Sequence, residues 1–113
     1  MVDDDDAVRD SLRFLLNSAG YGVATYASGV QFLQEAPLGE LSCLVVDQQM
    51  PDLTGIQTIA RLRALGVNLR VALITSSPSP ELVRLAQELG ADVVLEKPLD
   101  DDKLFRFVAG TAS

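Results

Sequence analysis

Short apolar runs alternate with helix-like stretches along this chain, and this alternation constrains the fold more than any other feature. The runs at 41–46, 71–74 and 92–95 are short and apolar, as expected for strands buried on both faces of a parallel sheet. A run at 22–27 alternates in the manner of a fourth strand. Because right-handed crossovers join parallel strands, these elements predict a doubly wound α/β fold.

Five helices are predicted from apolar residues at helical spacing and from residues that favour helix ends. The first covers 7–19, with Asp5 or Asp6 as its N-cap and Gly20 after it. The remaining four begin at these capping residues: Ser28, Thr54, Ser79, and Asp100 or Asp101. Each helix lies between two predicted strands or at an end of the series, so the sheet should be flanked by helices.

The start of the chain does not fit a complete sheet. A strand should precede the first helix, but only Met1 and Val2 stand before the acidic run. In the flavodoxin-like strand order 2-1-3-4-5 the first strand is central. We therefore expect that strand to be truncated or missing, with a stub or a strand exchanged from another chain filling the gap.

Length and composition limit the classes of function. A chain of 113 residues predicts a single domain over 1–113. The net charge of −7 argues against direct nucleic-acid binding, which needs clustered Lys and Arg. No apolar run has the length of a membrane span, and one cysteine, Cys43, fits a reducing compartment such as the cytoplasm. The sequence has no histidine, which excludes histidine-based catalysis.

Asp47 is the first candidate functional residue. It follows the apolar run 41–46, so its carboxylate should lie at the carboxyl end of a buried strand, where open α/β sheets bind ligands. The acidic run 3–6 and Lys97 should converge on the same end of the sheet. Clustered carboxylates repel one another unless a cation lies between them, and Mg²⁺ prefers such oxygen ligands. The set predicts a magnesium-assisted phosphoryl site.

Other groups near this end could complete the site. The backbone carbonyl of Gln49 can reach an ion bound by Asp47, and Thr75 offers a hydroxyl at the end of the neighbouring strand. Lys97 offers a mobile ammonium for a phosphoryl oxygen. No other nucleophile is both acidic and at a strand end, so Asp47 is expected to form an acyl phosphate.

The ordered motifs resemble the receiver domain of two-component response regulators, in the FixJ-like subgroup. The matching stretches extend over the whole chain at the spacing of that family, and they are 2–5, 7–12, 47–55, 74–75 and 96–98. The resemblance implies that Asp47 accepts phosphate from a sensor histidine kinase. It also implies that the domain is not an enzyme acting on a free substrate.

The resemblance also implies roles for individual residues. Asp4 would contact Mg²⁺ directly and Asp3 through water, with Asp4 and Asp5 as the alternative pair. Gln49 would bind the metal through its backbone carbonyl, and Thr75 would supply the switch hydroxyl. Lys97 would bind the phosphate through its ammonium, and the peptide bond before Pro98 would be cis.

The resemblance is less complete at the residues that would transmit the effect of phosphorylation. Val94 stands where the family often has Phe or Tyr, so coupling to Thr75 should differ from the usual pattern. The resemblance implies transcriptional control through a homodimer, formed by the helix after Ser79, the strand 92–95 and the last helix. Exchange of the N-terminal segment is a second route to a dimer.

Two other functions fit parts of the sequence. A degenerate receiver could act as an interaction or dimerisation module without phosphorylation, which the short first strand and Val94 favour. A small magnesium phosphatase is the third reading. It is disfavoured because Gln49 stands where such enzymes have a second aspartate, and because there is no cap domain.

Overall fold

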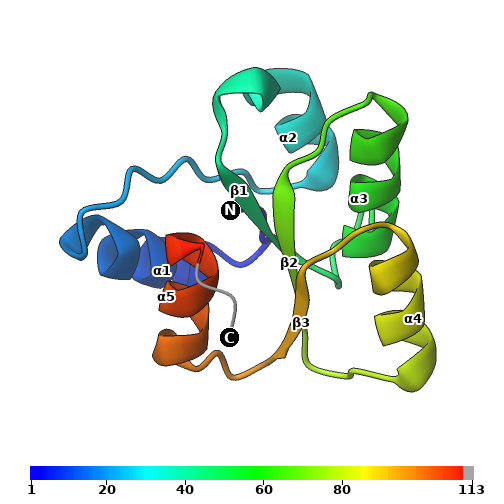
Figure 1. Ribbon diagram of the computed structural model, residues 1–113. Helices are drawn as coiled ribbons and strands as arrows, with labels where there is room; N and C mark the ends of the chain where they lie inside the picture. The colour runs from blue at the N-terminus through cyan, green and yellow to red at the C-terminus, as the bar shows by residue number, and fades with distance from the viewer. Residues whose placement is uncertain (111–113) are drawn as a thin grey trace.

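The computed structural model describes residues 1–110, so the last three residues of the predicted 1–113 domain lie outside the described part. Figure 1 shows the described helices and strands. In chain order they are α1 (Asp6–Ser18), α2 (Gly29–Glu35), the 3₁₀ turn η1 (Leu38–Glu40), β1 (Cys43–Asp47), α3 (Gly55–Ala64), β2 (Arg70–Thr75), α4 (Pro80–Glu88), β3 (Val93–Glu96) and α5 (Asp101–Ala109). None of these helices is long and apolar enough to cross a bilayer.

The three strands form one parallel sheet in the order β1-β2-β3. Asp47 pairs with Ile74, and Thr75 pairs with Glu96, so the carboxyl ends of the strands meet at one edge of the sheet. The predicted strands at 41–46, 71–74 and 92–95 are confirmed with shifts of one or two residues at their ends.

Val2 acts as the stub of a central first strand. It forms isolated parallel bridges with Tyr26 on one side and Val46 on the other, and its side chain is completely buried. Its N–H donates to the carbonyl of Val45 at 2.8 Å, and its carbonyl accepts from the N–H of Asp47 at 2.9 Å. The order matches the predicted 2-1-3-4-5, but the first two strands of that order are each reduced to one bridging residue, Val2 and Tyr26.

The predicted strand at 22–27 is wrong. Only Tyr26 pairs, in its bridge with Val2. A strand at 22–27 needs a neighbouring strand of similar length with which to pair. The neighbouring N-terminal segment offers only Met1 and Val2 for pairing. A cavity of about 310 Å³ lies between this segment and the beginning of β1.

Two apolar layers enclose the sheet. On one face, α1 and α5 lie side by side (Figure 1) and pack Leu12, Leu16, Leu104 and Phe107 against the strands. On the other face, side chains from α2, α3 and α4 form a second cluster with the strands, and it includes Phe32, Ile59, Leu62 and Ala86. Burial on both faces explains the nearly continuous apolar sequence of β1 and β2.

The helices begin where the capping residues predict. Asp5 caps α1 through the N–H groups of Ala7 and Val8, which resolves the choice between Asp5 and Asp6. Asp100 caps α5 in the same way. The other caps are Ser28, Thr54 and Ser79, and Thr54 forms a full capping box with Gln57.

Replacing Val2 tests its structural role. Val2→Ala should lower the free energy of unfolding by about 2 kcal/mol, because it leaves a cavity at a fully buried position. Urea denaturation followed by circular dichroism measures the change. Val30→Ala is the matched control, since Val30 is 38% exposed on α2 and should shift stability by less than about 0.5 kcal/mol. Equal stability of the two variants would contradict the central position of Val2.

Candidate functional site

Asp47 lies at the carboxyl end of β1, and its neighbours fix it there. The residue is 3% exposed. The N–H of Gln48 donates to the carbonyl of Ile74 at 2.8 Å, so the sheet pairing continues just past the aspartate. Gly55 packs so closely that a Cβ there would lie 2.8 Å from the carbonyl oxygen of Asp47. A glycine is therefore required where α3 meets the end of β1.

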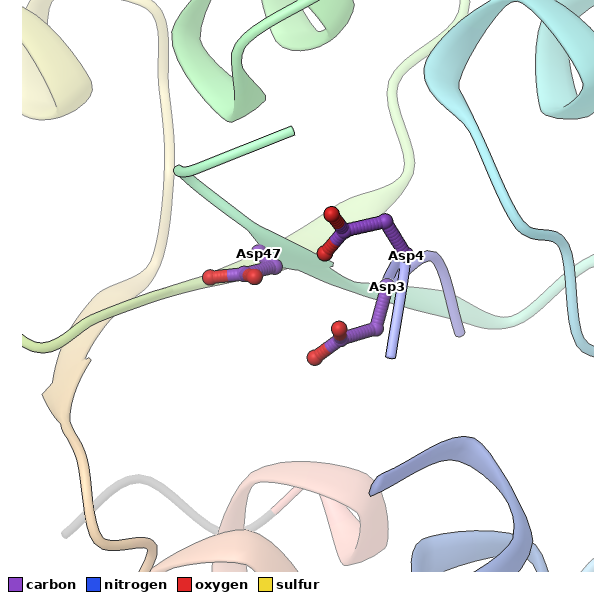
Figure 2. A group of neighbouring side chains, drawn as sticks. All are labelled: Asp3, Asp4 and Asp47. Atoms are coloured by element: carbon purple, nitrogen blue, oxygen red, sulfur yellow. The ribbon is translucent and has the colours of Figure 1, made fainter. Parts of the chain in front are cut away.

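Asp3 and Asp4 lie beside Asp47, because Val2 pairs with β1 immediately before them. Figure 2 shows the three carboxylates, with Asp3 and Asp4 coming from the N-terminal segment and Asp47 from β1. One oxygen from each lies within 4.8 Å of the others. Asp3 and Asp47 are buried and Asp4 is exposed. Oxygen ligands at this separation, open to solvent on one side, fit a Mg²⁺ ion that retains some of its waters.

Lys97 contributes the positive charge of the site. Its Nζ lies 3.2 Å from Oδ2 of Asp47 and 3.6 Å from Oδ2 of Asp3. The backbone N–H of Lys97 donates to the carbonyl of Thr75 at 2.8 Å, and the Lys97–Pro98 peptide bond is cis. Burial lowers the pKa of the ammonium, but the carboxylates of Asp3 and Asp47 outweigh this effect and raise it above the ordinary value.

Asp3 has the least favourable electrostatic environment of the site. Burial raises its pKa, the N–H of Asp5 opposes that shift, and the carboxylate of Asp47 adds to it. Oδ1 accepts from the N–H of Asp5 at 2.9 Å, whereas Oδ2 is buried without a hydrogen bond. A buried carboxylate oxygen with an unfilled lone pair is well suited to face a cation, either directly or through water.

The two remaining predicted residues lie at the same edge. The N–H of Gln49 donates weakly to Oδ1 of Asp47 at 3.5 Å, and its side-chain oxygen accepts from the hydroxyl of Ser76 at 3.4 Å. Thr75 ends β2 with 1% exposure, and its hydroxyl oxygen accepts from the N–H of Ser77 at 3.1 Å. The structure thus brings the loops after β1 and β2 together.

The structure adds residues that sequence reasoning did not single out for the site. Arg9 contacts the backbone of Asp3, and Ser76 bridges to Gln49. The spacing of Asp6 and Arg9 could have indicated an ion pair on α1. Nothing in the sequence indicated that the guanidinium also reaches the carbonyl of Asp3, because that contact depends on how α1 leaves the sheet.

Comparison with known families assigns nearly the whole chain. The family model of the response regulator receiver domain matches residues 1–109. The chain is 40% identical over 104 residues to the transcriptional regulatory protein FixJ of Bradyrhizobium diazoefficiens, covering 92% of this chain and 51% of that protein. It is 34% identical over 106 residues to the C4-dicarboxylate transport transcriptional regulatory protein DctR of Rhodobacter capsulatus, covering 92% and 54%. The chain thus spans about half the length of these relatives.

Solved structures show the same fold. The response regulator StyR matches with a TM-score of 0.89 and 35% identity, covering 96% of this chain and 55% of that one. The structure of FixJ-N matches with a TM-score of 0.86 and 32% identity, covering 96% of this chain and 86% of that one. The chemotaxis protein CheY4 of Vibrio cholerae has a TM-score of 0.88 at 26% identity, covering 98% and 94%.

The burial of Asp3 beside Asp47 allows a prediction of how the charge of Asp3 affects the free energy of unfolding. Without metal at neutral pH, Asp3→Asn should raise the free energy of unfolding by about 1 kcal/mol, because it removes a buried charge that the folded state disfavours. In the unsubstituted protein the pKa of Asp3 is raised in the folded state above its ordinary value of 3.8. The free energy of unfolding should therefore fall as the pH rises from 3.8 through the raised pKa of Asp3. Asp3→Asn should lose that dependence.

Urea denaturation of the metal-free proteins across this pH range measures both effects. Asp10→Asn is the matched control, because it removes the same charge from an exposed position on α1 and should change the free energy of unfolding by less than about 0.5 kcal/mol. A less stable Asp3→Asn protein with an unaltered pH profile would show that the cluster does not oppose the ionised form of Asp3.

Proposed function

Since the chain belongs to the response regulator receiver family of two-component signalling, we propose that residues 1–113 form one receiver domain in which Asp47 accepts a phosphoryl group. The observation that carries this proposal is the convergence of three carboxylates and one ammonium at a strand end. The donor would be the phosphohistidine of a sensor histidine kinase, and the site of action the cytoplasm. The domain would assist its own phosphotransfer and dephosphorylation without acting on a free substrate.

The acidic cluster would bind Mg²⁺ through Asp3, Asp4, Asp47 and the backbone carbonyl of Gln49. A bound Mg²⁺ would neutralise negative charge on the phosphoryl oxygens, and charge neutralisation together with positioning is most of what phosphoryl transfer requires. The buried Oδ2 of Asp3 and the mutual approach of the carboxylates support the three aspartates of this set.

The chemistry at Asp47 follows from its surroundings. One carboxylate oxygen attacks the phosphorus atom of the phosphohistidine. The new O–P bond forms as the P–N bond breaks, and the electron pair returns to the imidazole nitrogen of the donor. Lys97, which already lies 3.2 Å from Oδ2 of Asp47, then donates to an oxygen of the phosphoryl group. The product is an acyl phosphate on Asp47.

The proposed output begins at Thr75. Its hydroxyl accepts from the N–H of Ser77, and reorientation toward the phosphoryl group would release that hydrogen bond and move the loop after β2. Val94 packs against the apolar cluster beside α4, where it offers less area than an aromatic ring. The α4–β3–α5 face is the proposed dimer surface, with exchange of the N-terminal segment as the alternative. FixJ and DctR are transcriptional regulators by name, which supports a role in transcriptional control.

A second candidate function is a receiver that acts as an interaction module without phosphorylation. Val94 favours it, because this side chain offers less packing area than an aromatic ring for coupling to Thr75. Titration with Mg²⁺ separates the two functions. Saturable binding at millimolar concentrations supports the phosphoacceptor, and its absence supports the interaction module.

Phosphorylation in vitro tests the leading function. Acetyl phosphate with Mg²⁺ should add the mass of one phosphoryl group to the intact protein, because the small donor supplies the same electrophilic phosphorus. The adduct should be absent from Asp47→Asn and present in Asp10→Asn, whose exposed carboxylate lies on α1. Intact-protein mass spectrometry at neutral pH measures the adduct. An unmodified parent protein, or an adduct that persists in Asp47→Asn, would contradict the assignment.

A further inference from the structure

Arg9 is half-buried at the start of α1 and points back toward the acidic run. Its side chain is 15% exposed. One terminal nitrogen donates to the backbone carbonyl of Asp3 at 2.5 Å, and the other contacts the carboxylate of Asp6. The guanidinium therefore joins the end of the stub strand to the first residue of the helix.

Asp3 is restrained by four contacts. One is the ion pair of its Oδ2 with Nζ of Lys97 at 3.6 Å, and Arg9 supplies another. The N–H of Asp3 donates to the carbonyl of Tyr26 at 3.2 Å, and its Oδ1 accepts from the N–H of Asp5 at 2.9 Å. The contact from Arg9 restrains the carbonyl. That carbonyl belongs to the peptide group that links Asp3 to Asp4, so the contact restrains the backbone between the two aspartates.

We propose that Arg9 is a positioning residue for the magnesium site, and this proposal rests on the function proposed above. The planar guanidinium donates in two directions at once, toward Asp3 and toward Asp6, which fixes the turn between the stub strand and α1. A lysine ammonium at the end of a flexible chain does not reproduce this geometry. Groups that orient metal ligands without touching the metal commonly alter metal affinity when they are replaced.

The sign of the effect separates positioning from charge. A positive charge near a cation site repels the cation, so removing Arg9 would strengthen Mg²⁺ binding if its charge were its only influence. Positioning predicts the opposite, because a carboxylate free to turn away must be ordered again on binding. Arg9→Lys keeps the positive charge but removes the planar guanidinium that donates in two directions. A positioning role therefore predicts weaker Mg²⁺ binding in that variant as well.

The test is calorimetric titration of Mg²⁺ into the unsubstituted protein, Arg9→Lys, Arg9→Ala and Arg13→Ala. Both Arg9 variants should raise the Kd for Mg²⁺ about tenfold. Arg13 lies exposed on the same helix, so Arg13→Ala removes one charge from α1 and should leave the Kd unchanged or slightly lower. The amide resonance of Asp5, which reports its hydrogen bond to Asp3, should shift in the metal-free Arg9 variants only.

Each outcome decides the proposal. Weaker binding in Arg9→Lys, with far-ultraviolet circular dichroism like that of the parent, supports it even if Arg9→Ala does not fold. Unchanged or tighter binding in Arg9→Lys overturns the role of Arg9 and leaves the magnesium site standing. No saturable binding in the unsubstituted protein overturns both this proposal and the phosphoacceptor function.

Discussion

The hydrogen bonds of Val2 are the interaction on which the candidate site depends. The backbone of Val2 pairs with β1 through Val45 and Asp47, and the next residue, Asp3, donates to Tyr26. These bonds hold the N-terminal segment in the middle of the molecule, directly before the acidic run. A short parallel ladder therefore decides whether Asp3 and Asp4 lie beside Asp47 or extend into solvent.

The position of Asp3 beside Asp47 is electrostatically unfavourable. Asp3 is fully buried beside Asp47, and burial raises its pKa. Lys97 offsets part of the repulsion, since it contacts both carboxylates and its own pKa is raised in return. The compensation is incomplete, because Oδ2 of Asp3 has no hydrogen bond. A site that disfavours its own charge in the absence of metal would be stabilised by a divalent cation.

Much of this arrangement can be predicted from the sequence, because the responsible signals are local. Apolar runs identify β1, β2 and β3, and capping residues such as Asp5 identify where helices begin. The position of Asp47 follows from its place at the end of an apolar run. The segment 22–27 was wrongly predicted as a strand, because strand formation depends on the length of a neighbour that local pattern does not reveal. The contact of Arg9 with Asp3 and the close packing of Gly55 depend on tertiary geometry in the same way.

The proposed phosphoacceptor Asp47 acts together with its acidic neighbours and with Thr75. The most direct measurement is the amide spectrum of the isotope-labelled protein during addition of beryllium fluoride, a tetrahedral mimic of a phosphoryl group, with Mg²⁺ present. Saturable shifts are expected at Asp47, Thr75, Ser77 and Lys97, and they should require Mg²⁺ and vanish in Asp47→Asn. A spectrum that beryllium fluoride leaves unchanged, or changes equally in Asp47→Asn, would contradict this role of Asp47.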